Sequence, residues 1–274
     1  MKFAHLSDIH FTIHPQDYPM IRSNLHDALS LLVDDLSRIE KHIDFISITG
    51  DLTQVGDLDS CRGLKTLLDR LTIPVYVVPG NHDLRGPFRD VFGASNIETS
   101  DAALDYAYSF GKVQVLGFDT MIEGEVSGRI SETQLARLQI NLNSEAFSHT
   151  VVSMHHPPFP TKHSDFDAMG LMEGVDELGA MIGSAKSKVI LLCGHVHRPY
   201  QAVWNGANCY ISGGPPFQIG SSFCFGDSEL DVVDEPYAYF IHSIDQRGDH
   251  VVGTRYVELS GGPSSSGNQR GASR

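Results

Sequence analysis

The feature that most constrains the fold is an alternation of apolar runs and amphipathic segments over the first 83 residues. Short apolar runs at 2–7, 43–49 and 75–78 have the length and composition of buried strands. Apolar residues recur at three- and four-residue steps in the intervening segments, about 20–42 and 58–71. This β-α-β-α-β order predicts a parallel sheet with right-handed crossovers, whose ligands lie beyond the carboxyl ends of the strands.

Five short polar clusters follow closely on apolar runs along the chain. They are Asp8-Ile9-His10, Gly50-Asp51, Gly80-Asn81-His82-Asp83, His155-His156 and Gly194-His195-Val196-His197. Any one of them alone is better explained as a helix cap, a turn or a strand end. Every cluster supplies His, Asp or Asn, and each follows closely on an apolar run. We therefore interpret the clusters as loops that converge on two metal ions.

The later part of the chain continues the same pattern. Alternating stretches about Gly111 and about Asn205-Gly206 predict hairpins, and Ser131 with Gln134 predicts a helix start. Further apolar runs precede the last two clusters, and strand patterning returns at 237–244 and 250–257. We expect one domain over residues 1–259.

Two segments break this pattern. Residues 213–236 are rich in Gly, Pro, Ser and Phe and lack helical or strand period. They predict either a loop that covers the site, with Phe217, Phe223 and Phe225 as a wall, or a packing or dimerisation segment. The tail 260–274 predicts disorder.

The composition limits the partners. A formal net charge of −14 argues against binding to a nucleic-acid polymer, which needs a basic surface. No apolar run reaches the ~20 residues that span a bilayer, and no signal peptide is visible, so a cytoplasmic location is the expectation. The four cysteines show no close pairing and predict neither a disulfide nor a sulfur ligand.

The order and spacing of all five clusters resemble the calcineurin-like metallophosphoesterases over roughly residues 1–200. The reading His-His-Pro-Pro at 155–158 is most similar to the branch of class III cyclic-nucleotide phosphodiesterases and bacterial glycerophosphodiesterases. The resemblance implies an α/β fold, a four-layer α/β/β/α sandwich of two mixed sheets flanked by helices. It also implies a homodimer or a higher homo-oligomer.

The resemblance implies two divalent metal ions, Fe, Mn, Zn or Co, with Asp51 as the bridging ligand. The first metal would be held by Asp8, His10, Asp51 and His197, and the second by Asp51, Asn81, His155 and His195. His82, with Asn81, is expected at the substrate, where His82 binds the phosphate or protonates the leaving oxygen. Asp83 either orients His82 for catalysis or caps the following turn. His156 is expected behind the ligands and not among them.

The implied reaction is hydrolysis of a small phosphodiester, such as a cyclic nucleotide or a glycerophosphodiester, by a hydroxide that bridges the two metals. The branch resemblance, and not the ligand set, favours a diester. A phosphomonoesterase of the same superfamily is one alternative. A metal-stabilised binding protein without activity is the other, although the presence of every ligand position and of His82 speaks against it.

Overall fold

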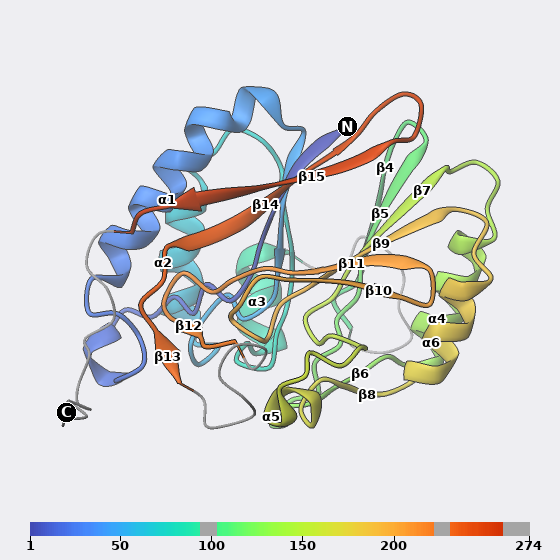
Figure 1. Cartoon of the computed structure of the whole chain (residues 1–274). Helices are drawn as coiled ribbons and strands as arrows, with labels where there is room; N and C mark the ends of the chain where they lie inside the picture. Colours follow the sequence, from blue (N-terminus) through green and yellow to red (C-terminus); the bar gives the residue numbers. More distant parts are fainter. Residues whose placement is uncertain (94–102, 222–230, 260–274) are drawn as a thin grey trace, which may run out of the picture.

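Two large mixed sheets face each other in the computed structural model, with helices on both outer sides (Figure 1). The structure describes residues 1–93, 103–221 and 231–259. The first sheet has the order β15 (His250–Val257), β14 (Tyr237–Ile244), β1 (Lys2–Leu6), β2 (Phe45–Thr49) and β3 (Val75–Val78). The second has the order β10 (Tyr200–Trp204), β11 (Ala207–Ile211), β9 (Lys188–Cys193), β7 (His149–Ser153), β5 (Val113–Gly117) and β4 (Tyr106–Phe110). The predicted four-layer sandwich is confirmed.

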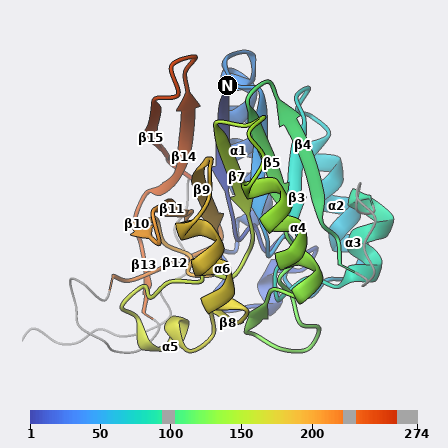
Figure 2. The same cartoon turned by 90° about the vertical axis from the view of Figure 1, so that its right-hand side faces the viewer.

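Helices cover the outer face of each sheet (Figures 1 and 2). The helices against the first sheet are α1 (Leu25–Ile39), α2 (Leu58–Leu68) and α3 (Arg85–Phe92), and those against the second are α4 (Glu132–Leu142) and α6 (Val175–Gly183). Short elements complete the described chain: α5 (Ser164–Asp167), the 3-10 turns Pro15–Asp17 and Glu40–His42, and the pairs β6 (Gly128–Arg129) with β8 (Leu171–Glu173) and β12 (Gln218–Ile219) with β13 (Val232–Val233). None of the described helices combines the length and apolarity that a bilayer crossing requires.

Most predicted boundaries agree with the structure. Ser131 and Gln134 form a capping box at the start of α4, as predicted. The first helix is shorter than the predicted 20–42, because it begins after Asn24 and the chain continues from Glu40 to His42 as a 3-10 turn. Residues 213–236, which show no strand period in the sequence, contain the short strands β12 and β13, and these pair with each other. Strands of two residues are too short to show any period. Phe223, Phe225 and the tail 260–274 lie outside the described residues.

Parallel pairing gives the first sheet its functional edge. β1 pairs with β2, and β2 with β3, all in parallel, so their carboxyl ends lie at one edge of the sheet. β7 and β9 are also parallel to each other in the second sheet. Both sheets therefore deliver their strand-end loops to the same end of the sandwich (Figure 1).

The core between the sheets contains a stack of aromatic rings that includes buried histidines. The His242 ring is completely buried and stacks on Phe3, with ring centroids 4.6 Å apart. Its Nδ1 lies 3.1 Å from His250 Nε2. Burial lowers the pKa of His5 to about 3 and of His250 to about 4, and it lowers the pKa of His242 well below the ordinary value. These imidazoles are therefore neutral in the folded protein.

This cluster predicts loss of stability in acid. The unfolded chain protonates histidine below a pKa of about 6.5, whereas the folded chain does not. Each imidazole therefore contributes stability that is complete above pH 6.5 and is lost as the pH falls, at up to about 1.4 kcal/mol per pH unit. We expect His242→Phe to reduce the fall in unfolding free energy between pH 7.5 and 5.5 by about 1.4 kcal/mol, measured by urea denaturation. Exposed His42→Phe is the control. A wild-type pH dependence in His242→Phe would contradict this origin.

Candidate functional site

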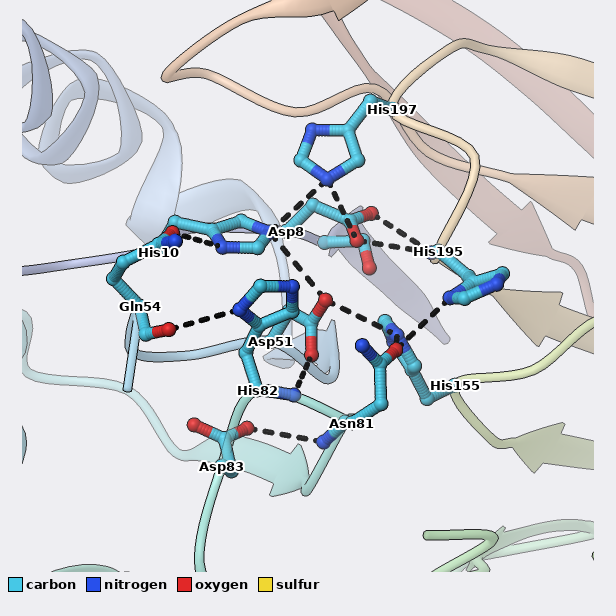
Figure 3. A network of polar contacts seen from close by, with 12 residues as sticks. Asp8, His10, Asp51, Gln54, Asn81, His82, Asp83, His155, His195 and His197 are labelled. Carbon is cyan, nitrogen blue, oxygen red and sulfur yellow. Dashed lines mark hydrogen bonds and ion pairs between the residues drawn. The ribbon is translucent and has the colours of Figure 1, made fainter. Parts of the chain in front are cut away.

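The predicted site residues come together at the shared end of the two sheets (Figure 3). Asp8 and His10 follow β1, Asp51 follows β2, and Asn81 and His82 follow β3. From the second sheet, His155 follows β7, and His195 and His197 follow β9. Among these side chains, the carboxylates and the His10, His155, His195 and His197 imidazoles are almost wholly withdrawn from solvent.

One group of possible ligand atoms contains Asp8, His10, Asp51 and His197. His10 Nε2 lies 3.0 Å from His197 Nε2 and 3.4 Å from Asp51 Oδ2. His197 Nε2 lies 3.6 Å from Asp8 Oδ1. Two ring nitrogens and two carboxylates from three different loops thus face one small volume.

A second group forms on the other side of Asp51. Asn81 Oδ1 lies 3.0 Å from His155 Nε2 and 3.0 Å from His195 Nδ1. His155 Nε2 is 3.3 Å from Asp51 Oδ2. The same carboxylate oxygen of Asp51 therefore lies within 3.4 Å of a ring nitrogen from each group.

The geometry of both groups fits divalent cations. Donors about 2.1 Å from a metal in tetrahedral or octahedral coordination are roughly 3.0–3.4 Å apart, which is the spacing of most of these atoms. The donor set is imidazole, carboxylate and amide, which suits Fe, Mn, Zn or Co. Burial lowers the pKa of His10 to about 4 and of His195 to about 3, so both rings are in the neutral form that binds metal.

The pKa values of the two carboxylates, Asp8 and Asp51, shift in opposite directions. Burial, with Asp51 adding to its effect, raises the pKa of Asp8 to about 7. Burial alone would raise the pKa of Asp51 too, but the neighbouring His155 holds it well below its usual range. Asp51 also raises the pKa of His155 to about 9 against the opposing effect of burial. Without a metal, a proton on His155 thus compensates the charge of Asp51, and a divalent cation would replace that proton.

The backbone at the site is held in unusual conformations. Seven non-glycine residues in the described chain have positive φ, and five of them are Asp8, His10, Asp51, His195 and His197. Each such residue costs of order 1–3 kcal/mol unless its surroundings hold it in place. Gly50, at φ +92°, has no room for a side chain, since a Cβ would lie 2.4 Å from His155 Nδ1. The strain is thus concentrated where the candidate ligands must turn toward one another.

Gln54 belongs to the site but was not predicted from the sequence. Its side-chain Oε1 lies 2.8 Å from His10 Nδ1, and its backbone oxygen lies 2.8 Å from His82 Nδ1. The Nδ1 atom of each ring must donate to its Gln54 oxygen. The Nε2 atoms of His10 and His82 therefore point away from Gln54. A glutamine three residues after Asp51 carries no signal of this role in the sequence.

The contacts of Asp83 correct an expectation. Its carboxylate accepts hydrogen bonds from the backbone N–H groups of Gly80, Leu52 and Thr53, and from the Thr53 hydroxyl. These bonds occupy both oxygens and tie the loop after β3 to the loop after β2. Gln54, and not Asp83, holds the His82 ring. We therefore regard Asp83 as a residue that positions the two loops, and not as a catalytic one.

His156 is engaged on both sides of its ring. Nε2 donates to the Val126 carbonyl at 3.1 Å, and Nδ1 accepts from the Thr120 hydroxyl at 2.8 Å. Although the ring lies near His155 and His195, its nitrogens have no lone pair left for a metal. This arrangement agrees with the expectation that His156 stands behind the ligands.

A cleft of about 300 Å³ opens above the two groups. His10, Asp51, Asn81, His82, His195 and His197 line its base. Its other lining residues are Tyr18, Pro19, Met20, Ile21, Gln54, Val126, Phe166, Met169, Phe217 and Ile219. A neighbouring cavity of about 540 Å³, lined by 214–218 and 233–237 among others, contains none of the candidate ligands.

Comparisons with known proteins agree with this geometry. Residues 1–199 match the family model described as calcineurin-like phosphoesterase. The chain is 25% identical over 248 residues to "Probable glycerophosphodiester phosphodiesterase GpdQ" of Arcobacter nitrofigilis, which covers 90% of each chain. It is 30% identical over 173 residues to the 3',5'-cyclic adenosine monophosphate phosphodiesterase CpdA of Pseudomonas aeruginosa, covering 63% of this chain and 61% of that protein.

Solved structures share the fold at lower identity. Purple acid phosphatase PPD1 from yellow lupin superposes with a TM-score of 0.64 at 13% identity, over 96% of this chain and 52% of that chain. GAP50, the anchor in the inner membrane complex of Plasmodium, superposes with a TM-score of 0.60 at 12% identity, over 96% of this chain and 85% of that chain. These likenesses concern the architecture alone.

Proposed function

Because the chain belongs to the calcineurin-like phosphoesterase family and is a metal-dependent phosphodiesterase, we propose that it hydrolyses small phosphodiesters at a centre of two divalent metal ions. The family match confirms the resemblance drawn from the order of the motifs. The observation that carries the dinuclear proposal is the position of Asp51 Oδ2, within 3.4 Å of His10 Nε2 on one side and of His155 Nε2 on the other.

The ligand roles follow from the two groups. Asp8, His10, Asp51 and His197 would hold the first ion, and Asp51, Asn81, His155 and His195 the second. Two divalent cations, when bound, activate water for attack on phosphorus and neutralise the charge that develops on the phosphoryl oxygens. Fe, Mn, Zn and Co all suit this donor set.

His82 is the residue of the site that acts on the substrate. Its Nδ1 donates to the Gln54 carbonyl, and its backbone N–H donates to Asp51 Oδ1 at 2.8 Å. Its ring lies edge-on to His10, with centroids 4.6 Å apart, and lines the cleft. With Nδ1 committed as a donor, Nε2 can serve the substrate when the ring is doubly protonated, because its N–H then donates to a phosphoryl oxygen or gives its proton to the leaving oxygen. Asn81, at the base of the same cleft, contacts the substrate as well as a metal.

The charge of the cleft supports a diester over a monoester. No lysine or arginine is among the described residues that line it. A phosphodiester carries one negative charge, whereas a monoester carries up to two, and beyond the metal ions no cationic side chain of the described lining would pair with the second charge. The names of the relatives point the same way, since both are phosphodiesterases.

A substrate panel tests this function. With Mn²⁺ added, we expect turnover of bis(p-nitrophenyl) phosphate, and a higher kcat/KM for cyclic nucleotides or glycerophosphocholine than for p-nitrophenyl phosphate. A preference for the monoester would favour the phosphomonoesterase alternative. No metal-dependent turnover of any substrate would favour the binding protein without activity. A homo-oligomer, a cytoplasmic location and a role of 213–236 in covering the site stay predictions.

Gln54 offers a prediction about metal affinity. Gln54→Leu keeps the size of the side chain but removes the acceptor that orients His10 Nδ1. We expect the affinity for the first metal to fall roughly ten- to hundredfold, the usual effect of losing such a partner. Metal titration against a competing chelator measures this affinity. Gln139→Leu, at an exposed position of α4, is the matched control. Equal affinity in Gln54→Leu and wild type would show that the His10 ring is oriented without Gln54.

A further inference from the structure

The walls of the cleft differ in character from its base. The base consists of the candidate metal ligands with His82 and Gln54, and the walls are almost entirely apolar. One wall comes from residues 18–21, which follow the 3-10 turn after β1, and includes Tyr18 and the exposed Met20. The other walls include Val126, Phe166 and Phe217. Four segments far apart in the sequence thus build one apolar recess beside the reacting centre.

Several polar groups near this recess are already engaged. The side-chain oxygen of Gln54 binds His10, and its backbone oxygen binds His82. Arg198 is paired with Glu235 and the Ile219 carbonyl, and Arg22 lines the neighbouring larger cavity. A polyol that entered the recess would therefore lose hydrogen bonds to water and regain few from the protein, which is unfavourable.

Phe217 connects the recess to the candidate metal centre. Its ring stacks on His197, with centroids 4.0 Å apart and planes 13° from parallel, and its carbonyl oxygen is 3.4 Å from His197 Nδ1. Its ring centroid lies 5.8 Å from that of His10. The segment packs closely here, because a Cβ on Gly214 would lie 2.4 Å from His197 Nδ1. An aromatic wall is therefore held in place directly against one of the candidate ligands.

We propose that this recess binds an apolar or aromatic ester substituent of the phosphodiester, and that Phe217 and Met20 are specificity-determining residues. The inference rests on the proposed function, because it places phosphorus over the two groups of ligands. It narrows the substrate class: a diester with an aryl, alkyl or nucleobase-like substituent is favoured over one whose substituents are polyols. Transfer of such a group from water to an apolar site is the source of the preference.

Two probes that cannot be hydrolysed test the preference without relying on turnover. Methyl(3-phenylpropyl)phosphinate and methyl(2,3-dihydroxypropyl)phosphinate carry the single charge of a diester but only P–C bonds to their substituents. We expect the phenylpropyl probe to bind the Zn²⁺-loaded full chain roughly ten- to hundredfold more tightly, measured by isothermal titration calorimetry. Equal affinities, or tighter binding of the dihydroxypropyl probe, would overturn the proposal.

Variants locate the preference in the recess. Met20→Ser changes a wall without touching a candidate ligand, and we expect it to reduce the affinity ratio of the two probes severalfold at unchanged metal content. Phe217→Ala should reduce the ratio further, while Phe217→Leu should retain most of it. Ile140→Ser, at an exposed position on α4, should leave the ratio unchanged. A wild-type ratio in both Met20→Ser and Phe217→Ala would overturn the assignment.

The two proposals fail in different ways. If the probes bind with equal affinity but bis(p-nitrophenyl) phosphate is hydrolysed, the recess is wrongly assigned and the proposed function stands. If the phenylpropyl probe is preferred but no diester is hydrolysed with any of the four metals, the proposed function fails, and the recess remains a binding site for apolar phosphoryl compounds.

Discussion

Asp51→Asn should lower kcat/KM for bis(p-nitrophenyl) phosphate by roughly 10³-fold or more and reduce the bound metal below two ions per chain. The reason is the position of Asp51 Oδ2 between the two groups of ligands, 3.4 Å from His10 Nε2 and 3.3 Å from His155 Nε2. An amide has the shape of the carboxylate but no charge, so it cannot serve as a bridging anionic ligand. The same substitution removes the negative charge that two neighbouring cations require.

Metal content by elemental analysis and turnover with Mn²⁺ measure this expectation together. Asp59→Asn is the matched control, because the Asp59 side chain on α2 is 73% exposed and only loosely paired with Arg62. It should change neither quantity. If Asp51→Asn retained two ions per chain and the wild-type rate, Asp51 would not be the bridge, and the dinuclear proposal would lose its main support.

His82→Ala should lower kcat by roughly 10²- to 10⁴-fold while both metals stay bound. The ring of His82 donates from Nδ1 to the Gln54 carbonyl and lines the cleft. It belongs to neither group of candidate ligands. Alanine removes the ring but keeps the backbone N–H that donates to Asp51 Oδ1. The candidate bridge should therefore keep its position, and the loss should lie in the chemical step.

The separation of rate from metal content is what makes this result specific. We expect elemental analysis to give the wild-type metal content in His82→Ala, and kcat, rather than KM, to carry most of the change. His42→Ala, at an exposed position after α1, is the control and should behave as wild type. Loss of metal from His82→Ala would mean that His82 is itself a ligand.

Local patterns in the sequence predicted most of the scaffold and the candidate ligands. Strand and helix periods are properties of neighbouring residues, so the sequence alone indicates β1, β2 and β3 and the helices between them. In a parallel sheet the strand ends meet at one edge, so Asp8, Asp51 and their partners were expected to be close together. The helix start at Ser131 was predicted for the same local reason.

Residues whose roles depend on distant contacts escaped prediction. Gln54 has no motif of its own, and its function comes from His10 and His82, which approach it from other loops. Asp83 stands in a motif but accepts from backbone groups of its own loop and of the loop after β2, so its position in the sequence left its role open. β12 and β13 are too short for a period, and only the pairing of 218–219 with 232–233 defines them as strands.

The sequence by itself determined the fold class, the residue types of the candidate metal centre and the class of reaction. Strand and helix periods and the types of ligand in each motif are properties of short stretches of consecutive residues. Only the tertiary structure decided that Asp51 Oδ2 faces both groups, that Asp83 supports the loops, and that Phe217 and Met20 line the cleft. These facts are distances between atoms on different loops, and such distances are set by how two sheets pack and not by any local pattern.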